Sequence, residues 1–186
     1  NVVDTREGIT LRPMGPGEDA PRDPHIWLDP LLAKIQARTI ADELSRLDPD
    51  EAHLYAHNLA SLLDDLDSLD AEIREALGPA RGSTMLVFHP SWGYFADRYG
   101  LRQLAIEVEG KSPGARQLHE IIETARAQEV RVIFVQPQFS TAGAEAIARE
   151  IGAVVTYADP LPPDYIVELR RVARAIADKL DGGNYE

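Results

Sequence analysis

The chain has 186 residues, of which 44% are hydrophobic and 27% charged, a composition typical of a globular protein with one domain or slightly more. Nineteen Lys and Arg residues against 31 Asp and Glu residues give a net charge of -12, which disfavours nucleic acid and anionic lipid as partners. The chain contains no cysteine, so thiolate zinc sites, cysteine nucleophiles and disulfides are excluded. No apolar run reaches the roughly 18 residues that a membrane-spanning helix requires.

The first 25 residues contain an extended segment and a loop. The stretch "NVVDTREGITL" begins in the middle of a pattern, like the last strand of a preceding lobe, so we expect the chain to be a fragment of a longer protein. Residues 12–25 are rich in proline and glycine and have no helical or strand period, which predicts a loop.

Two helices are predicted to follow this loop. The first begins at Pro30, with Asp29 as its N-cap, and its apolar positions run to Leu47. The second covers residues 50–77, where Asp48 and Glu51 predict a capping box and Gly78-Pro79 ends the helix. Its apolar residues recur at spacings of three and four: Leu59, Leu62, Leu66, Leu69, Ile73 and Leu77.

The second half of the sequence alternates strand and helix patterns. Short apolar runs, "TMLVF", "LRQLAIEV", "RVIFV" and "GAVVTYA", are separated by helical patterns at residues 91–98, 114–128 and 141–151. A final helix is predicted across "DYIVELRRVARAIADKL". This βαβ series predicts the fold class α/β: a four-stranded parallel sheet with helices on both faces, three layers in all, preceded by the long helix.

Candidate site residues follow the predicted strands, because open parallel α/β sheets bind ligands at the carboxyl ends of their strands. These candidates are His89, Glu107, Glu109, Gln136 and Asp159. Imidazole and carboxylate are good ligands for a divalent metal ion, and a proline after His89 and after Asp159 restricts the local backbone. A hydrogen-bonded structural histidine and a turn-forming aspartate are the alternatives.

The remaining histidines differ in their surroundings. His53 and His57 stand at i and i+4 on the long predicted helix, a spacing that can chelate, but they fall opposite the leucine stripe and are interpreted as a solvated pair. His119 is predicted to be a surface residue as well. His25 lies in a loop between two Asp-Pro pairs, and either a ligand or a residue that caps a backbone carbonyl fits the pattern.

Motifs for enzyme chemistry are scarce. "GPGEDAP" lacks the Lys-Ser/Thr ending of a phosphate loop, and Ser91 near His89 has no nucleophile elbow. Glu107 and Glu109 could form a general-acid pair, although two carboxylates that leave a strand are usually only solvated.

Several motifs together resemble one family. "DPHIWLDP", "LDPDEAHLYAHNLASLLDDLDSLDAEI", "MLVFHPSWGYFADRYGL", "VIFVQPQFSTAGAEAIAREIGA" and "YADPLPPDYIVEL" resemble, in that order, the zinc- and manganese-binding solute-binding proteins of ABC transporters. The resemblance implies two α/β lobes joined by a long helix, with a metal ion between them. Residues 1–29 would be a remnant of the amino-terminal lobe and its loop, residues 30–78 a helix pair with the interlobe helix at 50–77, and residues 79–186 the carboxy-terminal lobe.

The resemblance also implies a ligand set and a function. His25, His89 and Asp159 match three metal ligands of the family, and a fourth, in the amino-terminal lobe, has no counterpart in this chain. Histidine rather than glutamate at position 89 favours zinc, with manganese possible. The implied protein is not an enzyme. It would be periplasmic or anchored at the cell surface, and it would deliver its metal to a membrane permease.

Four further expectations remain open. A metal-assisted hydrolase could use the same ligands with Glu107 or Glu109 as the base, and some surface-anchored relatives are adhesins. Since histidine must be neutral to bind a metal, capture should weaken as the pH falls through the imidazole range around 6.5. Loss of one lobe should expose part of the stripe from Leu31 to Leu77, so self-association of the fragment is expected.

Overall fold

The computed structural model of the chain describes residues 2–14, 20–107, 113–137 and 141–180. It divides into two compact units, residues 1–72 and 73–186, and the division falls within one long helix. None of the helices in the described ranges is long and apolar enough to cross a membrane.

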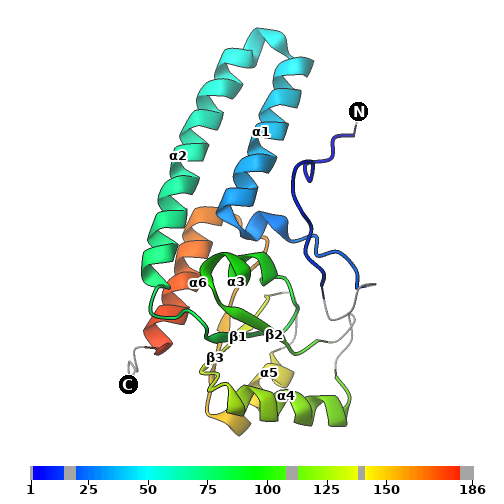
Figure 1. Cartoon of the computed structure of the whole chain (residues 1–186), viewed down its shortest axis with the longest axis vertical. Helices are drawn as coiled ribbons and strands as arrows, with labels where there is room; N and C mark the ends of the chain where they lie inside the picture. The colour runs from blue at the N-terminus through cyan, green and yellow to red at the C-terminus, as the bar shows by residue number, and fades with distance from the viewer. Residues whose placement is uncertain (1, 15–19, 108–112, 138–140, 181–186) are drawn as a thin grey trace. The chain divides into compact units, whose positions relative to one another are not determined.

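The first unit contains a hairpin of two helices (Figure 1). A 3-10 turn, η1 (Ile26–Leu28), precedes α1 (Pro30–Leu47), and a second turn, η2 (Pro49–Glu51), leads into α2 (Ala52–Ala76). Helix α1 begins at Pro30, where a missing N–H costs nothing, and the Asp29 side chain accepts a hydrogen bond from the Leu31 N–H at 2.9 Å. Lys34 of α1 and Asp67 of α2 form an ion pair across the hairpin.

Two predictions for this unit are wrong. The described part of "NVVDTREGITL" forms no strand, because a strand needs a backbone hydrogen-bonding partner and no other described segment pairs with it in this way. Asp48 forms no side-chain capping bond, since the helix opens with a 3-10 turn and the Asp48 carboxylate accepts a hydrogen bond from the Tyr55 hydroxyl at 3.3 Å. The predicted helix over residues 50–77 is therefore a short turn followed by α2.

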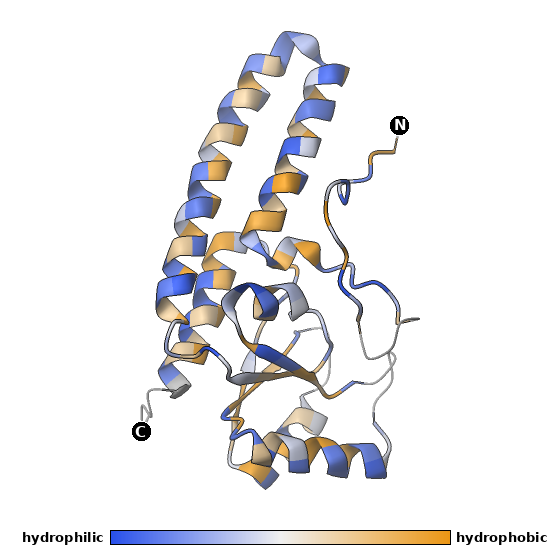
Figure 2. Ribbon diagram, in the orientation of Figure 1, coloured by the Kyte–Doolittle hydropathy of each residue, from blue (hydrophilic) through white to orange (hydrophobic). Residues whose placement is uncertain are grey.

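The predicted apolar stripe of this unit is only partly buried. Leu66 and Leu69 are almost fully buried, but Leu62, which the same spacing predicts to be inside, is 41% exposed. Ile40, Leu44 and Leu47 of α1 are also at least 40% exposed. Figure 2 shows hydrophobic and hydrophilic residues mixed along both helices of the hairpin. The pattern predicted the helices correctly and overestimated their burial.

The second unit is built on a parallel sheet. The strands β1 (Thr84–Val87), β2 (Arg102–Ala105), β3 (Val132–Val135) and β4 (Val154–Tyr157) are arranged in the order β2-β1-β3-β4. All three pairings are parallel. Helices connect the strands: α3 (Gly93–Tyr99), α4 (Ala115–Ala127) and α5 (Ala142–Ile151), and α6 (Tyr165–Leu180) closes the unit. The predicted fold class is confirmed.

Helices cover both faces of this sheet (Figure 1). On one face, Leu86 and Ile133 pack in a buried cluster with Ile121 of α4 and Ile147 of α5. Residues of the opposite parity, among them Phe134, lie on the other face, where Phe134 and Ile176 of α6 line a common cavity. Continuous burial of β3 is typical of a central strand in a parallel sheet.

Candidate metal centre

Polar side chains of the second unit follow the strands at regular positions. Three of them stand two residues beyond the end of a strand: His89 after β1, Glu107 after β2 and Asp159 after β4. Gln136 comes directly after β3. Because the strands are parallel, all four residues lie toward the same edge of the sheet. The described residues thus confirm the predicted placement, whereas Glu109 lies outside them.

His89 is held by a carboxylate from the neighbouring strand. Its Nδ1 atom lies 3.1 Å from each oxygen of Glu107. The pairing of β1 with β2 extends past the strand ends, where the Glu107 N–H donates to the Phe88 carbonyl at 2.9 Å. The Glu107 side chain is only 7% exposed and that of His89 27%. Such a buried carboxylate favours the tautomer with its proton on Nδ1, and the ring lone pair is then on Nε2.

The backbone at His89 is fixed by Gln136. The Gln136 Nε2 atom donates to the His89 carbonyl at 3.0 Å, and the His89 N–H donates to the Gln136 Oε1 atom at 3.3 Å. The same Nε2 atom donates to the Ser91 Oγ atom at 3.1 Å. Gln136 and Ser91 are buried, so these bonds form away from water. They hold the β1 loop against β3, and Ser91 acts in that loop as a hydrogen-bond acceptor.

Asp159 is positioned by the first turns of α6. The Asp159 N–H donates to the Glu168 carboxylate at 2.8 Å, and the Asp159 Oδ1 atom accepts from the Leu161 N–H at 3.0 Å. Arg171 donates to both Glu168 oxygens and to the Tyr157 carbonyl. Its hydrogen bonds with Glu168 raise the pKa of Arg171. This network connects the end of β4 to α6 and sets the turn that carries Asp159.

His25 of the first unit has a similar carboxylate partner. The fully buried Asp23 carboxylate lies 2.7 Å from the His25 Nδ1 atom and accepts the His25 N–H at 3.0 Å. Arg12 donates to the second Asp23 oxygen at 3.2 Å. The imidazole also makes an edge contact with Trp27, with 5.4 Å between ring centroids. The Asp23 carboxylate favours the tautomer with its proton on Nδ1, which leaves the ring lone pair on Nε2, as at His89.

The two Asp-Pro pairs around His25 have different tasks. Asp23 orients the imidazole, and Asp29 caps α1. Sequence reasoning identified the rigid loop but missed Asp23 as the partner of the ring, and it also missed Glu168. An aspartate two residues before a histidine was a usable signal for Asp23. Glu168 gave none, because it is nine residues from Asp159 and reaches it only through the fold.

The predicted ligands are divided between the two units, with His25 in the first and His89 and Asp159 in the second. Within neither unit do three or more His, Asp or Glu side chains of the described ranges form a group that could hold a metal ion. His53, His57 and His119 are exposed, as predicted.

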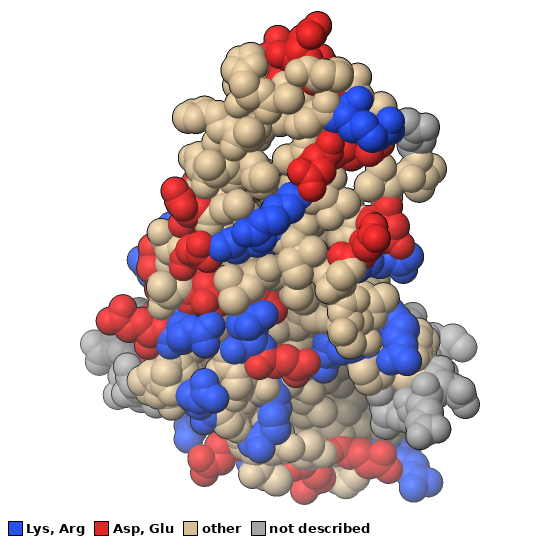
Figure 3. Space-filling view, turned by 45° about the horizontal axis from the view of Figure 1, so that its top comes forward, with Lys and Arg blue, Asp and Glu red and all other residues tan. Residues whose placement is uncertain are grey.

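Figure 3 shows acidic and basic side chains interspersed over one face of the molecule.

Comparisons with known proteins agree with this chemistry. A family model described as the periplasmic zinc-uptake complex component A, ZnuA, matches residues 1–179. The high-affinity zinc uptake system protein ZnuA of Paracoccus denitrificans is 34% identical over 168 residues, which cover 85% of this chain and 52% of that protein. The chain therefore spans about half the length of this relative.

Solved structures show the same fold. A crystal structure of ZnuA superimposes with a TM-score of 0.89 at 46% identity, covering 95% of this chain and 68% of that chain. The structure of a ZnuA deletion mutant with zinc bound superimposes with a TM-score of 0.88 at 47% identity. The superposition covers 95% of this chain and 67% of the mutant chain. With its family model matched over almost its whole length, the chain belongs to the ZnuA family of zinc-uptake components.

Proposed function

We propose that the protein to which this chain belongs captures Zn²⁺ outside the cytoplasm and delivers it to an ABC-type permease in the membrane. The observation that carries this proposal is the support given to two imidazoles. His25 and His89 each hold Nδ1 against a buried carboxylate, Asp23 or Glu107. Metal-binding histidines are commonly oriented in this way, because the outer carboxylate fixes the tautomer and raises the basicity of the coordinating nitrogen.

The proposed ligands are the Nε2 atoms of His25 and His89 and the carboxylate of Asp159. Zinc accepts nitrogen and oxygen ligands, typically at about 2.0–2.2 Å and in tetrahedral geometry. Two imidazoles in the set favour zinc, and manganese, which prefers more oxygen donors, is the second candidate cargo. The relatives named for zinc uptake support the same choice.

The contacts of Glu107 argue against the hydrolase alternative. A general base must reach the water or substrate from which it removes a proton. Both Glu107 oxygens face the His89 ring at 3.1 Å, and the carboxylate is almost completely buried. Glu107 therefore orients the imidazole and does not act as a base. Membership in a family of zinc-uptake components agrees with a role in transport.

A zinc titration with chelator competition tests the proposal. The unchanged chain is compared with His25→Ala, His89→Ala and Asp159→Ala variants. His119→Ala is the matched control, because His119 is an exposed histidine on α4. We expect one zinc ion per chain at the tight site, with affinity lost in each of the three ligand variants and unchanged in the control.

Equal affinity in the unchanged chain and the His89→Ala variant would contradict the proposed ligand set. If the unchanged chain binds no zinc, the same variants are made in a full-length protein of this sequence. Loss of zinc there on substitution of His25 or His89 supports the ligand assignment, and full retention rejects it.

A further inference from the structure

A second pair of histidines lies on α2, away from the proposed cargo ligands in the sequence. His53 and His57 occupy the first two turns of this helix at i and i+4. Both side chains are exposed, and neither makes a hydrogen bond or an ion pair with any residue that the structure describes. Nothing in the proposed capture mechanism uses them.

Helix geometry brings these two imidazoles within reach of one ion. Side chains at i and i+4 lie on the same face of a helix, with about 5–6 Å between their Cβ atoms. Two imidazoles at this spacing can bind one metal ion from the same side, with nitrogen-to-metal distances of about 2.0–2.1 Å. We propose that His53 and His57 form an auxiliary binding site for a divalent transition metal on the surface of α2.

The charges around this helix end are compatible with a cation. The amino-terminal end of a helix carries a partial positive charge, which disfavours a bound cation. Asp50 and Glu51 of the preceding turn η2 are both exposed and acidic, and Asp48 is the N-cap residue of that turn. These carboxylates offset the helix dipole within the same turn.

The number of ligands sets the strength and selectivity of the site. No third His, Asp or Glu completes a cluster among the described residues of this unit, so water fills the remaining positions. Binding should therefore be weaker than at a site with three or four protein ligands. For a pair of imidazoles the affinity should follow the order Mn²⁺ < Zn²⁺ < Cu²⁺.

The order of metals separates this site from general attraction to an acidic protein. The net charge of -12 attracts any divalent cation. Such attraction would retain Mn²⁺ and Zn²⁺ alike, and salt would screen it. A histidine chelate would prefer Cu²⁺ and would depend on both rings.

The test uses the 186-residue chain with His89→Ala, which removes a proposed cargo ligand. Zn²⁺, Cu²⁺ and Mn²⁺ are titrated separately at high salt by calorimetry. The matched variant combines His57→Ala with Asn58→His, and it keeps two histidines on the helix at i and i+5, where they point to different faces. His119→Ala is the second control.

We expect the chain with His89→Ala to bind Cu²⁺ and Zn²⁺. The affinity for both ions should fall at least tenfold in the His57→Ala/Asn58→His variant and should be unchanged in His119→Ala. Nuclear magnetic resonance of the histidine rings should show His53 and His57 shifting together on addition of Zn²⁺. Unchanged binding in the i,i+5 variant, with its helical content intact by circular dichroism, would overturn the auxiliary site. This outcome is independent of the proposed capture function, because that function is read from His25, His89 and Asp159.

Discussion

At the residue scale, the two proposed imidazole ligands differ in how firmly their carboxylates hold them. Asp23 contacts the His25 Nδ1 atom at 2.7 Å, is fully buried and is itself bound by Arg12. Glu107 shares its contact with His89 between two oxygens at 3.1 Å. A short, single hydrogen bond that the ring donates to a fixed carboxylate constrains the ring more than a bond shared between two oxygens.

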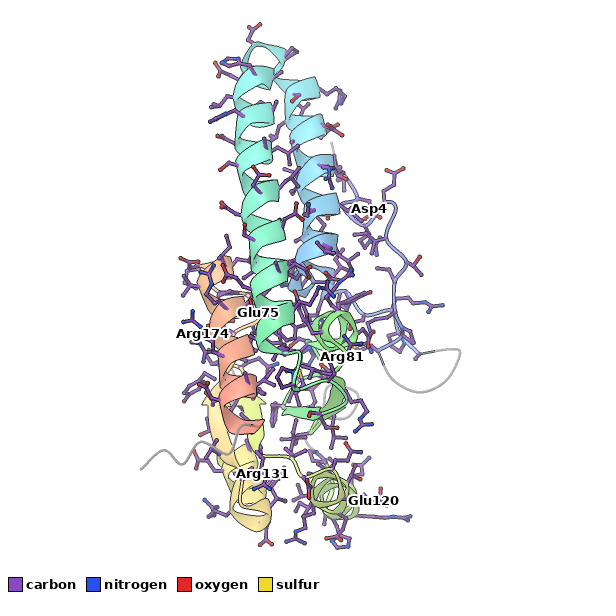
Figure 4. All side chains as sticks on the ribbon, turned by 60° about the vertical axis from the view of Figure 1, so that its left-hand side comes forward. Asp4, Glu75, Arg81, Glu120, Arg131 and Arg174 are labelled. Atoms are coloured by element: carbon purple, nitrogen blue, oxygen red, sulfur yellow. The ribbon has the colours of Figure 1, made fainter. Side chains whose placement is uncertain are left out.

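Replacement of these carboxylates should weaken zinc binding without removing a ligand. Loss of an outer-shell partner typically reduces metal affinity about 10- to 100-fold. We expect Asp23→Asn to fall nearer the upper value and Glu107→Gln nearer the lower, measured by chelator competition. Glu120→Gln is the control, because Glu120 is an exposed carboxylate on α4 (Figure 4). Equal affinities in all three variants, with unchanged thermal midpoints, would contradict the orienting role.

The Asp4 carboxyl gives a local pH prediction. Hydrogen bonds from the Arg6 side chain and N–H lower the pKa of Asp4 from 3.8 to about 2. A depressed folded-state pKa means that the contact is fully present above pH 3.8 and is lost as the pH falls toward 2. A carboxyl titration by nuclear magnetic resonance should therefore place Asp4 near 2, and Arg6→Ala should return its pKa toward 3.8. Titration near 3.8 in the unchanged chain would refute the contact.

At the element scale, the carboxyl end of α4 contains an unusual residue. Glu129 has a φ of +50°, and it is the one non-glycine residue with positive φ in the described ranges. The helix ends at Ala127 with Gln128 as its C-cap, and the Val130 N–H donates back to the Ala125 carbonyl at 3.0 Å. Glycine is the usual residue at this position after a helix, because it has no Cβ to strain the left-handed conformation.

Glu129→Gly should therefore stabilise the second unit. The relief of left-handed strain, about 1–2 kcal/mol, exceeds the entropic cost of a new glycine, about 0.5–1 kcal/mol. We expect the free energy of unfolding to rise by about 0.5–1 kcal/mol in urea denaturation. Glu129→Ala keeps the Cβ atom and should give no such gain. An equal gain from alanine would show that the carboxylate, and not the backbone conformation, is the destabilising feature.

The helix boundaries show how far local signals determine an element. Asp29 and Pro30 start α1 as predicted, because the cap and the proline act within two residues. The equivalent signals at Asp48 and Pro49 produce a 3-10 turn without a side-chain cap, and the Asp48 carboxylate instead contacts the Tyr55 hydroxyl seven residues later. The local motif therefore predicted the start of α1 correctly, whereas the predicted start at residue 50 falls in η2 and α2 begins at Ala52.

At the scale of the whole molecule, the chain exposes aliphatic side chains on its helical hairpin. Ile40, Leu44 and Leu47 repeat at spacings of four and three on one face of α1 and are 48%, 40% and 55% exposed. Leu54 of α2 is 43% exposed. In a solution of the pure chain, a second copy can cover this surface.

We accordingly predict self-association of the pure chain through α1. Sedimentation velocity should show larger species as the concentration rises, and Leu44→Lys combined with Leu47→Lys should remove them. Leu161→Lys is the control, because Leu161 is an exposed leucine of the second unit. A monomer at every concentration, or equal association in the hairpin variant and the unchanged chain, would contradict this prediction.

Local patterns in the sequence predicted most of the helices and all four strands of the sheet. The four strands and the helices between them follow from apolar runs of β-branched residues and from three-to-four spacing, which are local properties of the chain. The positions of His89 and Asp159 beyond their strands follow from the same pattern, because parallel strands end at one edge. The motif resemblance added His25 to the candidate ligands and suggested the family. The match to the family model confirmed the family.

The polar contacts at the candidate site could not be predicted from local patterns. Glu107 reached His89 through the pairing of β2 with β1, Gln136 through the pairing of β3 with β1, and Glu168 reached Asp159 through the packing of α6. The burial of the helical hairpin was likewise decided there, as the exposed Leu62 shows. The physical reason is common to these cases: hydrogen bonds and burial depend on neighbours distant in sequence, whereas a spacing pattern records only which face of an element is apolar.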